Sequence, residues 1–96
     1  MDKIFRYKDF SSPLDMADER VMQLLNKACR KNDLALKARS PKRRYIKMGY
    51  ACVELLDGLF GEGSAYKILG GSPTMDDIAD VMNALNEYAD VFKSGI

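Results

Sequence analysis

Residues 40–61 read SPKRRYIKMGYACVELLDGLFG, and this stretch predicts an amphipathic helix. Ser40 is a favourable N-cap and Pro41 suits the first helical position, so a helix is expected to begin here. Apolar residues then recur at the spacing of one buried helix face: Tyr45, Met48, Cys52, Leu55, Leu56, Leu59 and Phe60. Gly61 predicts the end of this helix. Gly49 lies inside it, at a cost in helix propensity, and indicates a close crossing with another helix.

A second amphipathic helix is predicted upstream. Ser12 and Pro13 repeat the start signal, and acidic residues follow where the helix dipole favours them. The apolar stripe of this helix runs through Leu14, Ala17, Val21, Leu24, Leu25 and Ala28. The helix ends either at residues 32–33 or after an extension through residues 34–36, and the pattern does not decide between them.

Two more helices are predicted downstream. Ser64 predicts the cap of a short helix over residues 65–69, which Gly70 and Gly71 close. The last helix starts at residues 72–74, where Thr74 and Asp77 have the spacing of a capping box. Its apolar stripe runs through Ile78, Val81, Met82, Leu85, Tyr88 or Ala89, and Phe92.

The first twelve residues, MDKIFRYKDFSS, mix apolar and charged residues and fit a short strand or an extended arm. A single strand finds no partner in this sequence, so its sheet would have to come from another chain, and irregular chain packed across the helices is the alternative. The predicted fold is therefore all-α: a single domain over residues 1–96, with three main helices, a one-turn helix and an extended N-terminal arm over residues 1–12.

Composition excludes several function classes. The 96 residues are 47% hydrophobic and 30% charged, the balance of an ordinary globular chain. They contain no histidine, which excludes Ser-His-Asp and Cys-His catalysis and histidine metal sites. No nucleophile–base pair or set of metal ligands is evident in the sequence. We therefore expect no enzyme activity, no catalytic residue, no cofactor and no metal site.

Cys29 and Cys52 lie among apolar neighbours at helical spacing, and both are predicted to be buried thiols in a reducing compartment. The first residues lack the apolar run of a signal peptide, and no apolar run approaches the length of about 20 residues needed to cross a membrane. An intracellular protein without a membrane partner is expected.

Charge is distributed unevenly along the chain. Residues 1–48 contain 13 Lys/Arg and 6 Asp/Glu, a net charge of +7, whereas residues 49–96 contain 2 and 8, a net charge of −6. Either the halves separate and favour head-to-tail association or a charged partner, or they pack together and neutralise each other. Residues 37–47 hold six cations and no acid, which fits phosphate contacts, a protein-facing patch or a solvated face. The sequence pI of 7.7 disfavours nucleic acid as a partner, because basic nucleic-acid modules usually exceed a pI of about 9.

Three further features have ordinary structural readings. Asp76, Asp77 and Asp80 occupy the first turns of the last helix, where acids cap and complement the dipole. The glycines of residues 58–64 form a corner between helices and lack the Lys-Ser/Thr of a phosphate loop. The tyrosines could stack on bases, but they more often pack along a helix with the hydroxyl in water: Tyr45, Tyr50, Tyr66 and Tyr88.

Residues 45–91 resemble small tail assembly chaperones of long-tailed bacteriophages and prophages. The resemblance lies in an Asp at the end of an apolar helix, followed by LFGEGSAYKILGG at residues 59–71 and a further acidic amphipathic helix. Leu69 stands where the family has Phe. The resemblance implies a non-catalytic all-α protein in the cytoplasm of a bacterial host cell, which coats the tape-measure protein, keeps it soluble and helps to recruit the tail-tube protein. A longer frameshifted form often accompanies such proteins.

A binding and assembly protein is thus the expected function. Six methionines suit an adaptable groove for a helix, and the two oppositely charged halves suit self-association along a tape-measure chain. The candidate partner-binding residues are Lys42, Arg43, Arg44, Lys47, Phe60 and Tyr66. Two alternatives stay open: a small nucleic-acid-binding regulator that uses the basic segment 37–47, and a structural tail or head-tail joining subunit.

Overall fold

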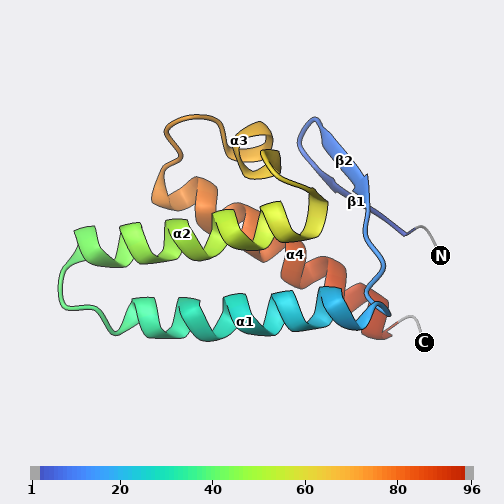
Figure 1. The fold of residues 1–96 in the computed structure, drawn as a ribbon, viewed down its shortest axis with the longest axis horizontal. Helices are drawn as coiled ribbons and strands as arrows, with labels where there is room; N and C mark the ends of the chain where they lie inside the picture. Colours follow the sequence, from blue (N-terminus) through green and yellow to red (C-terminus); the bar gives the residue numbers. More distant parts are fainter. Residues whose placement is uncertain (1–2, 95–96) are drawn as a thin grey trace.

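The computed structural model describes residues 3–94, which form one β-hairpin and four helices (Figure 1). The elements are β1 (Ile4–Tyr7), β2 (Phe10–Pro13), α1 (Glu19–Leu36), α2 (Pro41–Phe60), α3 (Ser64–Leu69) and α4 (Met75–Ser94). Helices α1 and α2 run antiparallel and side by side, and α4 crosses behind them, while α3 and the hairpin lie along the free edge of α2 (Figure 1). The connection between α1 and α2 forms one end of the long axis, and α1 begins and α4 ends at the other. The mostly helical fold is thus confirmed, with three main helices and a short one, while the hairpin and the start of α1 differ from the prediction.

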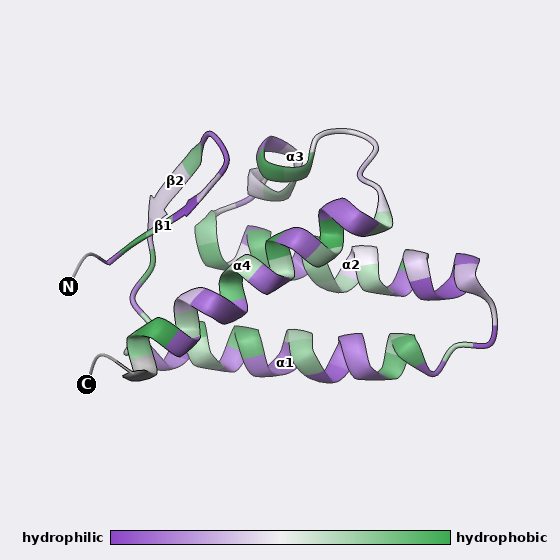
Figure 2. Ribbon diagram, turned by 180° about the vertical axis from the view of Figure 1, so that it is seen from behind, coloured by the Kyte–Doolittle hydropathy of each residue, from purple (hydrophilic) through white to green (hydrophobic). Residues whose placement is uncertain are grey.

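The apolar stripe of α2 supplies the centre of the core. Five of its predicted core residues are buried, namely Met48, Cys52, Leu55, Leu56 and Leu59. Cys52, Leu55, Leu56 and Leu59 belong to one core cluster, which also contains the following residues of α1 and α4: Val21, Leu25, Ala28, Ile78, Val81 and Leu85. From behind, α4 lies in front of α1 and α2, and hydrophobic and hydrophilic segments alternate along its ribbon (Figure 2). The other broad face of the α1–α2 pair, turned to the viewer in Figure 1, has no helix over it within residues 3–94.

The prediction of an extended N-terminal arm is wrong in one respect. Residues 4–13 form an antiparallel hairpin. Phe5 pairs with Ser12 and Tyr7 with Phe10, so the strand finds its partner within its own segment rather than in another chain. Lys8 makes the turn with a φ of 53°, in the left-handed region. Phe5 is only 1% exposed, and its ring packs edge-on against Tyr88 with the centroids 5.8 Å apart. The hairpin is therefore part of the core.

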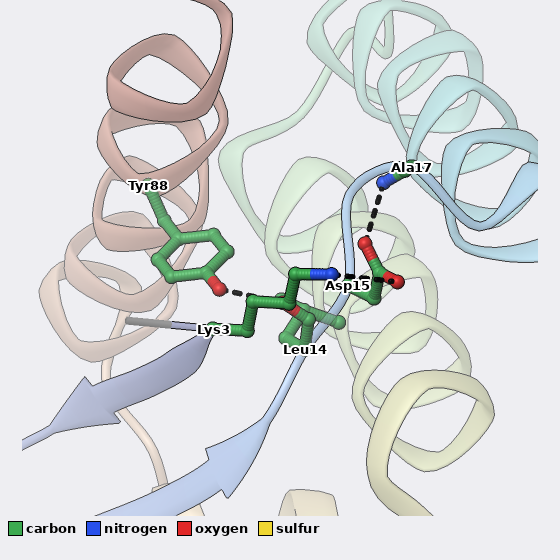
Figure 3. Close-up of polar contacts among 5 residues, drawn as sticks. All are labelled: Lys3, Leu14, Asp15, Ala17 and Tyr88. Atoms are coloured by element: carbon green, nitrogen blue, oxygen red, sulfur yellow. Dashed lines mark hydrogen bonds and ion pairs between the residues drawn. The ribbon is translucent and has the colours of Figure 1, made fainter. Parts of the chain in front are cut away.

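The first helix begins later than Ser12 and Pro13 predict. Pro13 ends β2, and the cap of α1 is Asp18, whose carboxylate accepts a hydrogen bond of 2.9 Å from the Arg20 N–H. In the linking segment, the Tyr88 hydroxyl donates to the Leu14 carbonyl at 2.5 Å and Asp15 accepts from the Ala17 N–H at 2.9 Å (Figure 3). These bonds hold the segment in a non-helical path across α4. At the other end α1 continues through Leu36, which settles the boundary that the sequence left open.

The other helix starts follow the sequence signals more closely. Ser40 caps α2 by accepting from the Arg43 N–H at 3.1 Å. Thr74 and Asp77 form a reciprocal capping box at α4, with N···O distances of 2.8 and 3.1 Å. Ser64 is buried as the first residue of α3 rather than acting as its cap, and the Asp57 carboxylate accepts from the Ala65 N–H at 2.9 Å instead.

The close approach of two helices occurs at Gly58, not at Gly49. A Cβ on Gly58 would lie 3.1 Å from the Leu24 side chain of α1, which is tighter than ordinary packing. A Cβ on Gly49 would lie 3.8 Å from Ile78, an ordinary contact distance. The Gly58 carbonyl also accepts a hydrogen bond of 3.1 Å from the Arg20 guanidinium, which fastens α1 to α2 at this point.

The two cysteines have different surroundings. Cys52 is buried as predicted, and its burial raises the pKa of its thiol to about 11. Cys29 is exposed, which corrects the prediction that both thiols are buried, because it lies beside rather than on the inward stripe of α1. Across residues 3–94, no helix combines the length and the apolar character that a membrane span requires.

Candidate partner-binding surface

The basic segment divides between two roles. Arg44 is partly buried, and its guanidinium donates to the Ala38 carbonyl at 2.9 Å, which ties the start of α2 to the loop after α1. Arg44 therefore has a structural role at the start of α2. The remaining cations form an exposed cluster at the α1–α2 connection, which we call the basic end: Lys37, Arg39, Lys42, Arg43 and Lys47. Within residues 3–94 none of these five forms an ion pair.

Phe60 also proves to be structural. Its ring stacks on Phe5 with the centroids 5.6 Å apart and an interplanar angle of 16°. It also meets Phe10 edge-on at 5.1 Å. Through these ring contacts Phe60, which is partly buried, joins α2 to the N-terminal strands.

An apolar surface instead follows the side of α2 that faces away from the core. Ile46, Tyr50 and Val53 are spaced i, i+4 and i+7, which places them on one helix face. All three are exposed, and Tyr50 is the most exposed, at 74%. We call this surface the outer groove, and it is made of Leu34, Ile46, Tyr50, Val53, Leu69 and Pro73.

Three hollows lie along the outer groove, and neighbouring hollows share lining residues. The first lies between α1 and α2, where Leu34 and Ala35 face Tyr50 and Ala51. Tyr50 also lines the second hollow, which extends over Val53 to Leu69 and Pro73. Val53, Leu69 and Pro73 in turn line a third hollow beside α3. Exposed apolar surface that is continuous over several elements is characteristic of interaction sites.

The segment between α3 and α4 forms one wall of the groove and is held in place. The Tyr45 hydroxyl donates to the Pro73 carbonyl, which fastens this segment to α2. Gly70, with a φ of 79°, ends α3 and lets the chain turn back toward α2. Tyr66 is 71% exposed and lines the third hollow beside Gly70 and Gly71. Of the predicted partner-binding residues, Tyr66 therefore does lie on this surface.

Charged residues border the groove where α1 meets α2. Lys31 and Lys47 both line the first hollow. Glu54 is paired with Lys31 and with Lys27, the latter at 2.8 Å, and hydrogen bonds from these two ammonium groups lower the pKa of Glu54 to about 2. Lys31 is thus already paired, whereas Lys47 has no ion pair within the described chain.

The acidic turn of α4 has a capping role. The backbone N–H of Thr74 donates to the Asp77 carboxylate, and the Thr74 hydroxyl accepts from the Asp77 N–H. Hydrogen bonding to Thr74, first of all to its backbone N–H, lowers the pKa of the Asp77 carboxyl. Since Tyr45 reaches Pro73, this turn lies beside the first half of α2. The basic and acidic halves of the chain therefore pack against each other instead of separating in space.

The six residues predicted to bind a partner do not lie on one surface of the structure. Lys42, Arg43 and Lys47 lie at the basic end, Tyr66 lies at the opposite end of the groove, and Arg44 and Phe60 serve the fold. The sequence-based prediction missed the apolar residues between them, above all Ile46 and Val53. A second i, i+4, i+7 stripe on the helix that already supplies the core was the available signal.

Comparisons with family models, with curated proteins and with solved structures give no match. The surface itself and the LFGEGSAYKILGG motif at residues 59–71 are therefore the grounds for a functional inference.

Proposed function

We propose that the protein is a non-catalytic tail assembly chaperone, which binds the tape-measure protein of a bacteriophage tail through the outer groove and assists assembly of the tail tube. The observation that carries this proposal is the coincidence of two features. Residues 59–71, which carry the family resemblance, build the corner, α3 and the wall that supplies Leu69. The exposed stripe of α2 lines the same groove.

The chemistry of the groove suits this role. A tape-measure protein is a long helical chain that aggregates when its apolar faces are uncovered, and helix-in-groove binding covers such a face. Tyr50 and Tyr66 supply large contact area at low conformational cost, which is typical of residues that dominate binding energy.

Co-expression tests the proposal. The tape-measure protein of the same genome is expressed with and without the affinity-tagged chain, and the soluble fraction is purified through the tag. We expect the tape measure to become soluble and to elute with an excess of copies of this protein. Tyr50→Gln should abolish the capture, whereas Val91→Gln, an exposed change on α4, should leave it intact.

Other outcomes would replace this function by another. Elution of nucleic acid with a steep salt dependence would favour a nucleic-acid-binding regulator acting through the basic end. Elution of a closed ring of this chain alone, with the tape measure still insoluble, would favour a structural tail or head-tail joining subunit.

A further inference from the structure

The dimensions of the outer groove match a short helix. The part of α2 that lines the groove, from Ile46 to Asp57, has 12 residues and therefore 11 helical rises. At a rise of 1.5 Å per residue this is roughly 16 Å, or about three turns of a helix laid along it. The exposed residues of the stripe repeat at i, i+4 and i+7, so a partner helix with the same repeat would place an apolar side chain against each hollow.

Charge makes the two ends of the groove different. At the start of α2, Lys42, Arg43 and Lys47 are exposed and have no ion pair within residues 3–94. At the far end the groove is bordered by Asp57, which is engaged by the Ala65 N–H. Cations beside an apolar hollow attract carboxylates on the partner, and opposite charge at one end fixes the direction in which a helix lies.

We propose that the outer groove binds a single amphipathic helix of about three turns, whose apolar stripe ends in carboxylates that lie over Lys47 and the adjoining basic end. This inference rests on the proposed function, because it names the kind of client segment that a chaperone of this shape receives. A second copy of this chain fits less well, since the apolar stripe of its acidic helix α4 is already used in its own core.

Two synthetic peptides test the inference on the full chain. Both have about 18 residues, long enough to form a helix, and share one leucine stripe at i, i+3, i+4 and i+7. One carries three glutamates in the terminal turn and the other three lysines. Binding is measured by fluorescence anisotropy at low salt. We expect the glutamate peptide to bind at least about tenfold more tightly, and the difference to shrink as salt screens the charges.

Matched variants separate the apolar from the ionic part. Val53→Gln should weaken both peptides by about fivefold or more, the level of an interface anchor, whereas Val91→Gln should leave both unchanged. Lys47→Gln should weaken only the glutamate peptide, whereas Lys8→Gln in the hairpin turn should weaken neither. The positions chosen are exposed, so circular dichroism and the thermal midpoint should match those of the wild type.

Equal affinity for the two peptides, or binding insensitive to Val53→Gln, would overturn the inference. So would sedimentation of the wild type as a dimer that Val53→Gln returns to monomer, because a second copy would then be the occupant. Tape-measure capture that persists in Val53→Gln would leave the chaperone function standing without this groove. Peptide binding as expected without tape-measure capture would leave the groove standing without the tail function.

Discussion

Phe60 and Tyr66 lie six residues apart on the same corner, but their rings have different surroundings. Phe60 lies between the rings of Phe5 and Phe10, whereas Tyr66 is 71% exposed. Phe60→Ala should lower the free energy of unfolding by about 3 kcal/mol, at the low end for aromatic truncation because the ring is half-buried. Tyr66→Ala should change it by less than about 0.5 kcal/mol. Urea denaturation of both variants measures this difference.

Equal destabilisation by the two substitutions would contradict the assignment of Phe60 to the fold and Tyr66 to the surface. The sequence places both residues at one apolar corner, and Phe60 also continues the core stripe of α2. It does not reveal that Phe5 and Phe10, more than 40 positions away, cover one ring and leave the other free. Burial that depends on such a distant segment cannot be predicted from local periodicity.

Within helix α2, replacing each of the two glycines by alanine should affect the free energy of unfolding differently. Gly49 has ordinary space around it, so Gly49→Ala should raise the free energy of unfolding by about 0.5–1 kcal/mol through helix propensity. Gly58→Ala gains the same propensity, but its Cβ would meet Leu24 at 3.1 Å where Arg20 also binds the backbone. The net effect at Gly58 should therefore be neutral or destabilising. Chemical denaturation of the two variants, with the wild type as reference, measures both signs.

A stabilising Gly58→Ala together with a destabilising Gly49→Ala would contradict this placement of the α1–α2 contact. The sequence predicts the helix ends well where a cap is local, as at Ser40 and at Thr74 with Asp77. It fails at Ser12 and Pro13, because the same two residues also suit the end of an edge strand. Their pairing with β1 and the hydrogen bond from Tyr88 to Leu14 decide against a helix there.

At the scale of the whole molecule, the core and the outer groove share one helix. One face of α2 carries the buried stripe of Met48, Cys52 and Leu55. The opposite face carries the exposed stripe of Ile46, Tyr50 and Val53. The first stripe can be predicted because it is the more apolar and the more regular. The exposure of the second stripe cannot be predicted without the positions of α3 and α4, since either helix could have covered it.

The reactivity of the Cys52 thiol measures whether α2 opens only when the whole molecule unfolds. It is 1% exposed at the centre of the core, and its pKa is raised to about 11, so it should react with a thiol reagent at pH 8 only after opening. In a Cys29→Ser background, which leaves one thiol, labelling should be slow in buffer and fast in denaturant. If opening is global, Phe60→Ala should accelerate labelling by about a hundredfold, matching its loss of roughly 3 kcal/mol.

The same thiol makes stability depend on alkaline pH. The pKa of Cys52 is 9.0 when unfolded and about 11 when folded, so the unfolded state loses its proton first. The stabilisation that depends on the protonated Cys52 is fully present below pH 9.0 and should be lost as the pH rises toward about 11. Cys52→Ala should remove this part of the pH dependence of the free energy of unfolding.

If Phe60→Ala leaves the labelling rate of Cys52 unchanged, α2 opens locally. In that case α2, which also lines the groove, would separate from its neighbours without unfolding of the whole molecule.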